Sequence, residues 1–191
     1  MCAWALSHNS ARMQCPMCAA EMEDEVLDAR LGLTVSIDIC RACQVLWFDP
    51  HEDLQLAPSS VLKLSQLITR QADASSAPGS AAAAASSPAC PRCGLRLLET
   101  QDQQRATKFE YFRCARGDGR LITFFNFLLE KDFIHPLSPE QIDELRQRNI
   151  QVISCSKCGA PVDLTRGPTC AHCGAALSML DVGKMAAPGP R

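Results

Sequence analysis

This sequence has few aromatic residues and no long hydrophobic run. Phe, Trp and Tyr make up 5% of its 191 residues, so no segment of the chain can bury a large core of its own. A membrane-spanning helix needs about 18 or more consecutive apolar residues, and no such stretch is present. The first residues lack the basic segment and the apolar core of a signal peptide. We therefore expect a cytoplasmic protein that does not contact membranes.

The signature motifs of common enzyme classes are also missing. The chain contains no His-Glu-x-x-His, no Gly-x-Ser-x-Gly, no phosphate-binding glycine loop and no deaminase pair of His-x-Glu with Pro-Cys-x-x-Cys. These motifs supply the nucleophiles, metal ligands and phosphate contacts of the corresponding reactions. We therefore expect neither an enzymatic activity nor a small-molecule substrate.

Cysteine, in contrast, is abundant. Ten of the 12 cysteines form pairs separated by two residues, and only Cys2 and Cys114 stand alone. Two thiolates at this spacing can bind one tetrahedral zinc ion at about 2.3 Å from a single tight turn, and a second such turn completes the coordination shell. The pairs therefore predict two four-cysteine zinc sites. The first contains Cys15, Cys18, Cys40 and Cys43, and the second contains Cys155, Cys158, Cys170 and Cys173.

Paired cysteines have two other common uses. A disulfide framework needs an oxidising compartment, which the N-terminal sequence does not indicate. A thioredoxin-like redox motif at Cys15 and Cys18 needs a surrounding βαβ pattern, which is missing, and it would leave the other pairs unexplained. Zinc accounts for all of the pairs, and in such small modules metal binding supplies much of the free energy of folding.

A third and less complete set of ligands lies in the middle of the chain. Cys90 and Cys93 form a pair, but the partner half of this set contains only Cys114. Asp118 is the nearest candidate for the fourth ligand, because a carboxylate oxygen binds zinc at a similar distance. His135 is a distant alternative, and an open position holding water is another. An open position would suit hydrolysis, although three thiolates would weaken the Lewis acidity of the ion.

The cysteine sets divide the chain into modules. The Ala-, Ser- and Pro-rich residues 71–89 lack apolar periodicity and predict a flexible linker, and we expect residues 1–12 and 183–191 to be disordered ends. The fold class expected is a small metal-stabilised α+β protein of three zinc-ribbon or knuckle modules, with short β-hairpins and flanking helices. The modules span residues 13–70, 90–137 and 138–182, the last beginning with a helix before the C-terminal ribbon.

Local patterns place secondary structure in the first module. Residues 33–39 alternate apolar and polar positions and predict a strand that leads into Cys40. Residues 47–52 indicate the start of a helix, because Asp49 can cap it and Glu52 completes a capping box. Residues 61–68 predict a second, short amphipathic helix.

Three further elements are expected in the rest of the chain. Residues 120–134 form the most apolar stretch and predict a buried helix, with a strand start over 121–125 and a partner-binding patch as alternatives. Ser138 begins a capping-box helix that runs towards Asn149. Val152 and Ile153 predict a strand that leads into the last ribbon.

A family resemblance rests on residues in the first module. The matching elements are Cys15-Pro16-x-Cys18, a strand of about seven residues, Cys40-x-x-Cys43, and Trp47-Phe48-Asp49 followed by Glu52. This block resembles the transcription-factor-IIB-type zinc finger of small bacterial proteins, although Gln44 and Val45 replace the glycine pair common in those fingers. The last four cysteines resemble a small zinc ribbon, with glycine after each pair. These resemblances imply zinc folds and leave a transcription-associated role open.

Charge bears on nucleic-acid binding. The formal net charge is -2, and zinc-bound thiolates would lower it to about -7, which opposes non-specific binding to DNA. Residues 15–57 carry nine acidic side chains against two arginines, whereas residues 90–120 carry seven basic against four acidic side chains. Aromatic and basic residues alternate there on a predicted strand, a pattern on which bases can stack. The tentative nucleic-acid contacts are Arg105, Lys108, Tyr111 and Arg113; the other interpretation is a hairpin that buries Phe109 and Tyr111.

Together these observations predict a zinc-binding, non-enzymatic interaction protein, most simply an adaptor that binds a partner protein. Two alternatives stay open. One is a transcription-associated protein that binds nucleic acid through the basic and aromatic middle module. The other is a redox sensor in which oxidation of zinc-bound thiolates releases the metal.

Overall fold

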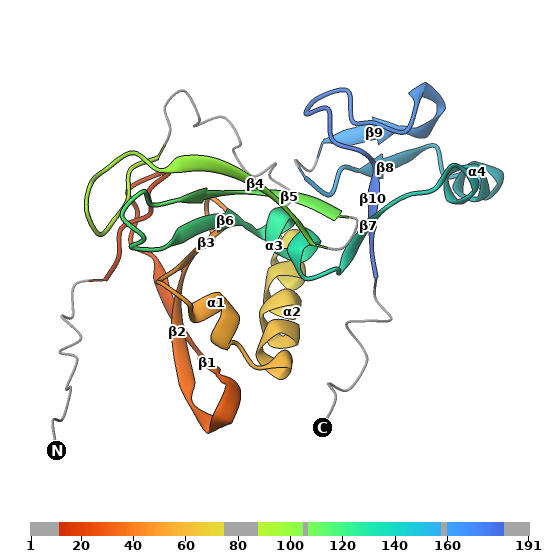
Figure 1. Ribbon diagram of the computed structural model, residues 1–191. Coiled ribbons are helices and arrows are strands. Elements are labelled where there is room, and N and C mark those ends of the chain that lie inside the picture. The colour runs from red at the N-terminus through yellow and green to blue at the C-terminus, as the bar shows by residue number, and fades with distance from the viewer. Residues whose placement is uncertain (1–11, 75–87, 105–106, 158–159, 182–191) are drawn as a thin grey trace, which may run out of the picture.

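The computed structural model describes residues 12–74, 88–104, 107–157 and 160–181 (Figure 1). Arg105 and Cys158, and most of the predicted linker and ends, lie outside the described residues. No helix in the described part of the chain is both long enough and apolar enough to cross a membrane. The described residues form a small α+β structure in which the strands are antiparallel.

A six-stranded sheet forms the centre of the molecule, with the strand order β1-β2-β3-β6-β5-β4. Strands β3 and β6 pair at its middle, with Trp47 opposite Leu121; we call this pairing the central seam. The first and middle modules expected from the sequence therefore share one sheet. The strands are β1 (Glu23–Asp28), β2 (Thr34–Cys40), β3 (Val45–Phe48), β4 (Leu98–Gln104), β5 (Thr107–Arg113) and β6 (Arg120–Thr123).

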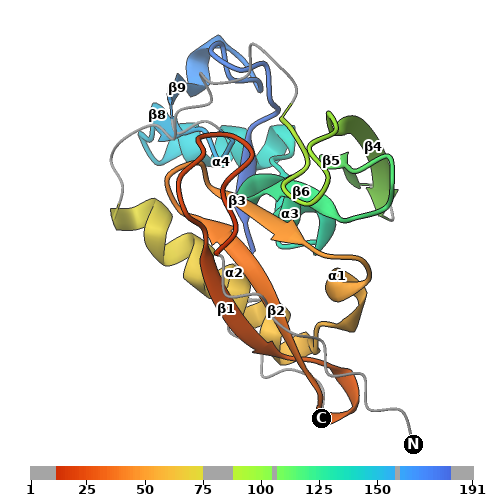
Figure 2. The ribbon, with the colours of Figure 1, turned by 90° about the vertical axis from the view of Figure 1, so that its left-hand side faces the viewer.

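The two halves of the sheet follow the same plan. Each half begins with a cysteine turn, continues through a hairpin of two strands, returns through a second turn and ends on a short strand at the seam. Because β3 and β6 are antiparallel, the halves are related by an approximate two-fold arrangement. The hairpin β1–β2 extends at its closed end away from the rest of the sheet (Figures 1 and 2).

Helices cover one face of the sheet and enclose the main core (Figures 1 and 2). These are α1 (Glu52–Gln55), α2 (Pro58–Ala74) and α3 (Phe124–Glu130). The core combines Ile37 and Phe48 from the sheet with Leu64 from α2 and Phe127 from α3, all fully buried. The rings of Phe48 and Phe127 stack with centroids 6.0 Å apart. This core joins both halves, because its side chains come from strands on either side of the seam.

The predicted helix start at residues 47–52 is wrong, because the helix begins only at Glu52. Trp47 and Phe48 belong to β3, where both are buried between neighbouring strands. Only half of the predicted capping box forms: the Asp49 backbone N–H donates to the Glu52 carboxylate at 2.8 Å, but His51 directly precedes α1 and no side chain caps the helix. The local signal for a helix was real, but the apolar residues before it are drawn into the sheet.

Two other elements differ in extent from the sequence expectation. Helix α2 runs from Pro58 to Ala74, so it is longer than residues 61–68 and continues past residue 70. In the apolar stretch 120–134, the strand β6 comes first and α3 starts at Phe124, so the strand-start alternative is confirmed for residues 121–123, whereas residues 124 and 125 belong to the helix. The Thr123 hydroxyl accepts the Asn126 backbone N–H at the start of α3, which fixes where the strand ends and the helix begins.

The C-terminal part forms two small sheets and one helix. Strand β7 (Ile134–Pro136) pairs with β10 (Ser178–Leu180), and β8 (Val152–Ser154) pairs with β9 (Pro161–Asp163). Helix α4 (Pro139–Gln147) has the predicted capping box, with reciprocal hydrogen bonds between Ser138 and Gln141. A separate apolar cluster includes Ile142, Leu164 and Leu177. Since β7 precedes residue 137, the β7–β10 pairing also crosses an expected module boundary.

Candidate metal centres

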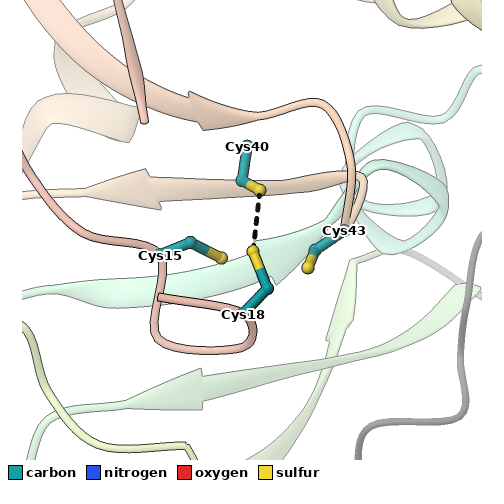
Figure 3. A group of neighbouring side chains, drawn as sticks. All are labelled: Cys15, Cys18, Cys40 and Cys43. Carbon is teal, nitrogen blue, oxygen red and sulfur yellow. Dashed lines mark hydrogen bonds between the residues drawn. The ribbon is translucent and has the colours of Figure 1, made fainter. Parts of the chain in front are cut away.

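The first cysteine set comes together at one end of the sheet. Cys15 and Cys18 lie in the turn before β1, Cys40 ends β2, and Cys43 lies in the turn before β3. Figure 3 shows the four sulfur atoms turned toward one another, and all four lie within 4.8 Å of one another. Cys18 Sγ and Cys40 Sγ are 3.7 Å apart, close to the edge of about 3.8 Å in a tetrahedron with bonds of about 2.3 Å to a central zinc ion. We call this set the first centre.

The backbone of each cysteine turn orients its thiols. In the first turn the Cys15 N–H donates to the Ala20 carbonyl at 2.8 Å, and the Ala19 N–H donates to the Cys15 carbonyl at 2.8 Å. The Met17 N–H points at Cys15 Sγ, 3.4 Å away. Ala19 takes a left-handed conformation with φ of 59°. Such N–H groups directed at sulfur are the outer-shell contacts that tune a thiolate ligand.

Gln44 explains how this chain does without glycine after Cys43. Its φ of 54° is in the left-handed region, where glycine is normally favoured. Its carbonyl accepts the Phe124 backbone N–H at 2.8 Å, so the turn is held against the start of α3. The departure from the resembled finger therefore leaves the turn geometry intact.

The thiols of the first centre have shifted acidities. Burial raises the pKa of Cys15 to about 11 and also raises the pKa of Cys43, whereas the backbone N–H of Ala20 lowers the pKa of Cys18. The four cysteines of this centre are all free thiols. Metal ligation requires free thiols, whereas a disulfide framework would have joined them in pairs. A metal ion that binds here must displace protons from these thiols.

The middle set converges in the same way at the other half of the sheet, and includes Asp118. Cys114 Sγ lies 3.3 Å from Asp118 Oδ2 and 3.5 Å from Cys93 Sγ, and Cys90 Sγ lies 4.0 Å from Asp118 Oδ2. A tetrahedral zinc ion with three sulfur ligands and one oxygen ligand would have edges of about 3.5 to 3.8 Å. These four residues could therefore hold a metal ion; we call them the middle centre.

The distant alternative, His135, is not part of this group. Its Nδ1 lies 3.6 Å from Asp132 and its Nε2 lies 3.8 Å from Asp181. These contacts place it at the β7–β10 sheet, where it is paired opposite Met179.

Hydrogen bonds from the thiols of Cys93 and Cys114 hold the pKa of Asp118 below its usual value, so the carboxylate is ionised and available as a ligand.

The C-terminal set is described for three of its four cysteines. Cys155, Cys170 and Cys173 form a group that could hold a metal ion, with Cys155 Sγ and Cys173 Sγ 3.7 Å apart. Cys158, the predicted fourth ligand, lies outside the described residues. His172, inside the last turn, is exposed.

Three turns share a feature that sequence reasoning missed. A buried Met or Leu follows the second cysteine by four residues, and its N–H donates to a carbonyl two residues before the first cysteine. These bonds join Met22 to Met13, Leu97 to Pro88 and Leu177 to Pro168, at 2.8, 2.8 and 2.9 Å. The pattern Cys-x-x-Cys-x-x-x-Met/Leu is present in the sequence and would have shown that the turns are repeats.

The first and middle centres share one apolar cluster on the sheet face opposite the helices. Trp47 and Leu121, the pair at the central seam, are buried there with Met22 and Leu97.

Arg92, between the two cysteines of its turn, reaches Asp49 with Nη2 2.6 Å from Oδ2. The Trp47 indole N–H donates to the same carboxylate at 2.9 Å. An open cleft of about 610 Å³ separates the turns, lined by residues 12–16, 19 and 89–92.

The structure separates the residues considered for nucleic acid. On β5, Lys108 lies on one face, and Tyr111 and Arg113 lie on the other, because neighbouring residues of a strand alternate. Phe109 is buried, and Tyr111 is half-buried and stacks on it at 6.1 Å. The aromatic rings therefore face the core, as in the hairpin interpretation. The described members of the predicted set do not form one surface.

A buried ion network at the seam was also missed. Arg120 contacts Asp53 of α1 at 2.8 Å and Glu130 of α3 at 3.0 Å, and Lys131 contacts Glu130 at 2.9 Å. The Arg120 guanidinium lies over the Phe48 and Tyr111 rings, 5.4 and 5.3 Å from their centroids. Arg120, Glu130 and Lys131 lie inside the apolar stretch 120–134, which masked them in the sequence.

Comparison of the chain with protein-family models, with curated proteins and with solved structures found no match. The three groups of potential ligands are compatible with zinc ribbons. The resemblance to transcription-factor-IIB-type fingers rests on the residues of the first module alone and stays a prediction.

Proposed function

We propose that this protein is a zinc-binding, non-enzymatic interaction protein, in which zinc holds the turns of the sheet and a protruding hairpin contacts a partner protein. The observation that carries the metal assignment is the first centre, where four thiols converge at tetrahedral spacing. Thiolates are soft ligands, and a tetrahedral four-sulfur set favours zinc or iron. Zinc is the simpler assignment, because it supports folding without redox chemistry.

The coordination chemistry supports a structural role. A centre with four protein ligands has no position for a substrate or a reactive water, whereas catalytic zinc sites keep one position open. The first centre offers four thiolates, and Asp118 supplies the fourth ligand in the middle centre. Both centres join the ends of strands of the six-stranded sheet. Loss of metal would therefore first disorder these strand ends.

The predicted partner patch at residues 124–133 does not support the adaptor role, because the structure buries it. Phe124, Phe127, Leu128 and Phe133 are all at most 6% exposed and pack in the core. This stretch therefore packs in the core between the sheet and the helices, and it is not a docking surface.

The hairpin β1–β2 is a better candidate for the contact. Its tip exposes Leu31 and Leu33, with 96% and 61% of their surface accessible, and it extends away from the sheet (Figure 2). Strand β1, which leads to this tip, has the sequence Glu-Asp-Glu-Val-Leu-Asp, so acidic side chains line one strand of the hairpin. This combination favours a protein partner with an apolar pocket and a basic rim, and it repels the phosphate backbone of nucleic acids.

The first experiment measures metal content by elemental analysis of protein purified without added metal. We expect three zinc ions per chain, one for each ligand group. Complete absence of bound metal would overturn the metal assignment. Iron in place of zinc would keep the sites but change their chemistry, and would favour electron transfer.

The partner contact is tested by affinity capture with the zinc-loaded protein and a Leu31→Ser/Leu33→Ser variant. We expect captured proteins to be lost with the variant, and each is then purified and titrated against both forms. Lys108→Ala/Arg113→Ala is the matched control. Both residues are exposed and lie on β5, in the half of the sheet opposite the hairpin β1–β2. Binding lost only in the control would favour the nucleic-acid alternative, to be checked with labelled single-stranded DNA at two salt concentrations.

The redox alternative has one supporting observation. Cys18 is exposed and Cys93 is half-buried, so an oxidant can reach one thiol of each centre. Zinc release on treatment with dilute peroxide, reversed by a thiol reductant and added zinc, would favour this alternative over a purely structural role.

A further inference from the structure

The two-fold arrangement of the sheet allows the first and middle centres to be compared ligand by ligand. In both halves a cysteine pair precedes the hairpin, and a single cysteine stands at the end of its second strand: Cys40 is the last residue of β2, and Cys114 directly follows β5. Three residues later the first half has Cys43, whereas the middle half has Gly117 followed by Asp118. The middle centre thus replaces one thiolate by a carboxylate within an otherwise matching frame.

This replacement weakens the hold on zinc. Thiolates select zinc, whereas carboxylates suit harder ions such as magnesium and calcium. Asp118 also lacks the support that a ligating carboxylate usually receives from surrounding groups. Among the described residues, its side chain forms hydrogen bonds only with the thiols of the centre itself. It lies half-buried between Gly117 and Gly119.

The ordering of the β4–β5 hairpin depends strongly on this centre. Six of the seven residues of β4 are exposed, including Leu98, so this edge strand adds little to the core. The ligands lie just before β4, just after β5 and just before β6, so one ion joins the ends of all three strands. The hairpin β1–β2 is held more firmly in the main core, where Leu27, Val35 and Ile37 are buried, whereas β4–β5 contributes only Phe109 as a buried residue.

We infer that the middle centre is an exchangeable zinc site, and that its occupancy controls the order of the β4–β5 hairpin. The first centre stays loaded and keeps the rest of the sheet folded. This inference rests on the proposed function, since it takes zinc to be the bound ion. It makes the protein responsive to the supply of zinc: when zinc is scarce, the middle half of the sheet loosens while the first half holds.

The test is a chelator time course on the full-length, zinc-loaded protein. EDTA is added in excess, and protein-bound zinc is measured by elemental analysis after rapid desalting. We expect one of three ions to leave about tenfold or more faster than the others, in line with the effect of a lost supporting contact. Hydrogen exchange followed by mass spectrometry should show the amides of 98–113 losing protection in the fast phase, while those of 34–40 keep it.

Two substitutions assign the fast phase. Asp118→Cys restores a fourth thiolate and should merge the fast phase with the slow ones. Cys43→Asp places a carboxylate in the first centre and should create a second fast phase; if this variant does not fold, Asp118→Cys alone decides. Release of all three ions in one phase, or a fast phase that Asp118→Cys leaves unchanged, would overturn the inference. Protein that carries no zinc before EDTA is added would instead overturn the proposed function.

Discussion

The two halves of the central sheet use the same turns and strands but differ in how they are stabilised. The half formed by β1, β2 and β3 places four thiols at its centre and buries one face of its hairpin in the main core. The half formed by β4, β5 and β6 has three thiols and a carboxylate, and its outer strand is mostly exposed. A repeated architecture can therefore combine a firmly held unit with one whose order depends more on metal.

The largest expected effect is loss of the first centre. Cys40→Ser removes a buried ligand at the end of β2 and should abolish the cooperative thermal transition followed by circular dichroism. Structural zinc contributes about 10 kcal/mol or more to small modules, which exceeds the stability of many domains. Cys114→Ser, the matching change in the middle centre, should leave a cooperative transition at lower temperature. Equal loss in both variants would contradict the difference between the halves.

The next effect concerns the close contact of the halves at Gly119. This glycine has φ of +143°, and a Cβ there would lie 2.6 Å from Trp47 Cζ2 and collide with the Phe48 carbonyl oxygen. Gly119→Ala should therefore destabilise the protein by about 4 kcal/mol through strain and overpacking together. Gly117→Ala is the control, because its φ is also positive but nothing lies within 4 Å of the added atom. Chemical denaturation of both variants should show a clearly smaller loss for the control.

A third change removes the ion network between the halves. Arg120→Ala leaves Glu130 buried with only Lys131 as a cationic partner, and should cost about 3 kcal/mol in the free energy of unfolding. Arg113→Ala removes an exposed arginine paired opposite Arg120 on β5, and should change stability by less than about 0.5 kcal/mol. Urea unfolding at a fixed zinc concentration measures both. Similar losses would show that the network does not join the halves.

The smallest effect depends on pH and concerns Glu52. Burial raises the pKa of Glu52 to about 7, above the usual value of a glutamate in an unfolded chain. The folded state therefore holds this proton more tightly, and the stability that it contributes is lost as pH rises from 4.5 to about 7. Glu52→Gln can still accept the Asp49 N–H, so it should melt at a higher temperature than the parent at pH 8. At pH 6 the difference should shrink, and it should stay below about 1 kcal/mol after solvent screening.

The ligand groups and several elements could be predicted from the sequence because their signals are local. A Cys-x-x-Cys turn carries its own geometry, and the Ser138 capping box lies within four residues, so both were found. The central seam could not be found in this way, since it joins residues about 75 positions apart through side chains that are simply apolar. Trp47 and Phe48 show the result: both were assigned to the start of a helix, because their strand partners Leu121 and Arg120 lie far along the chain.

The central seam joins the two halves of this chain in the way that an interface joins the two subunits of a homodimer. Two units of one architecture meet strand to strand, as two identical subunits would, but a covalent connection replaces the encounter of separate molecules. A fragment of residues 12–74 would present β3, all four of whose residues are buried in the whole protein, as an unpaired apolar edge. We expect such a fragment to associate with a second copy through β3, as sedimentation velocity can measure, so that the internal pairing is rebuilt between two chains.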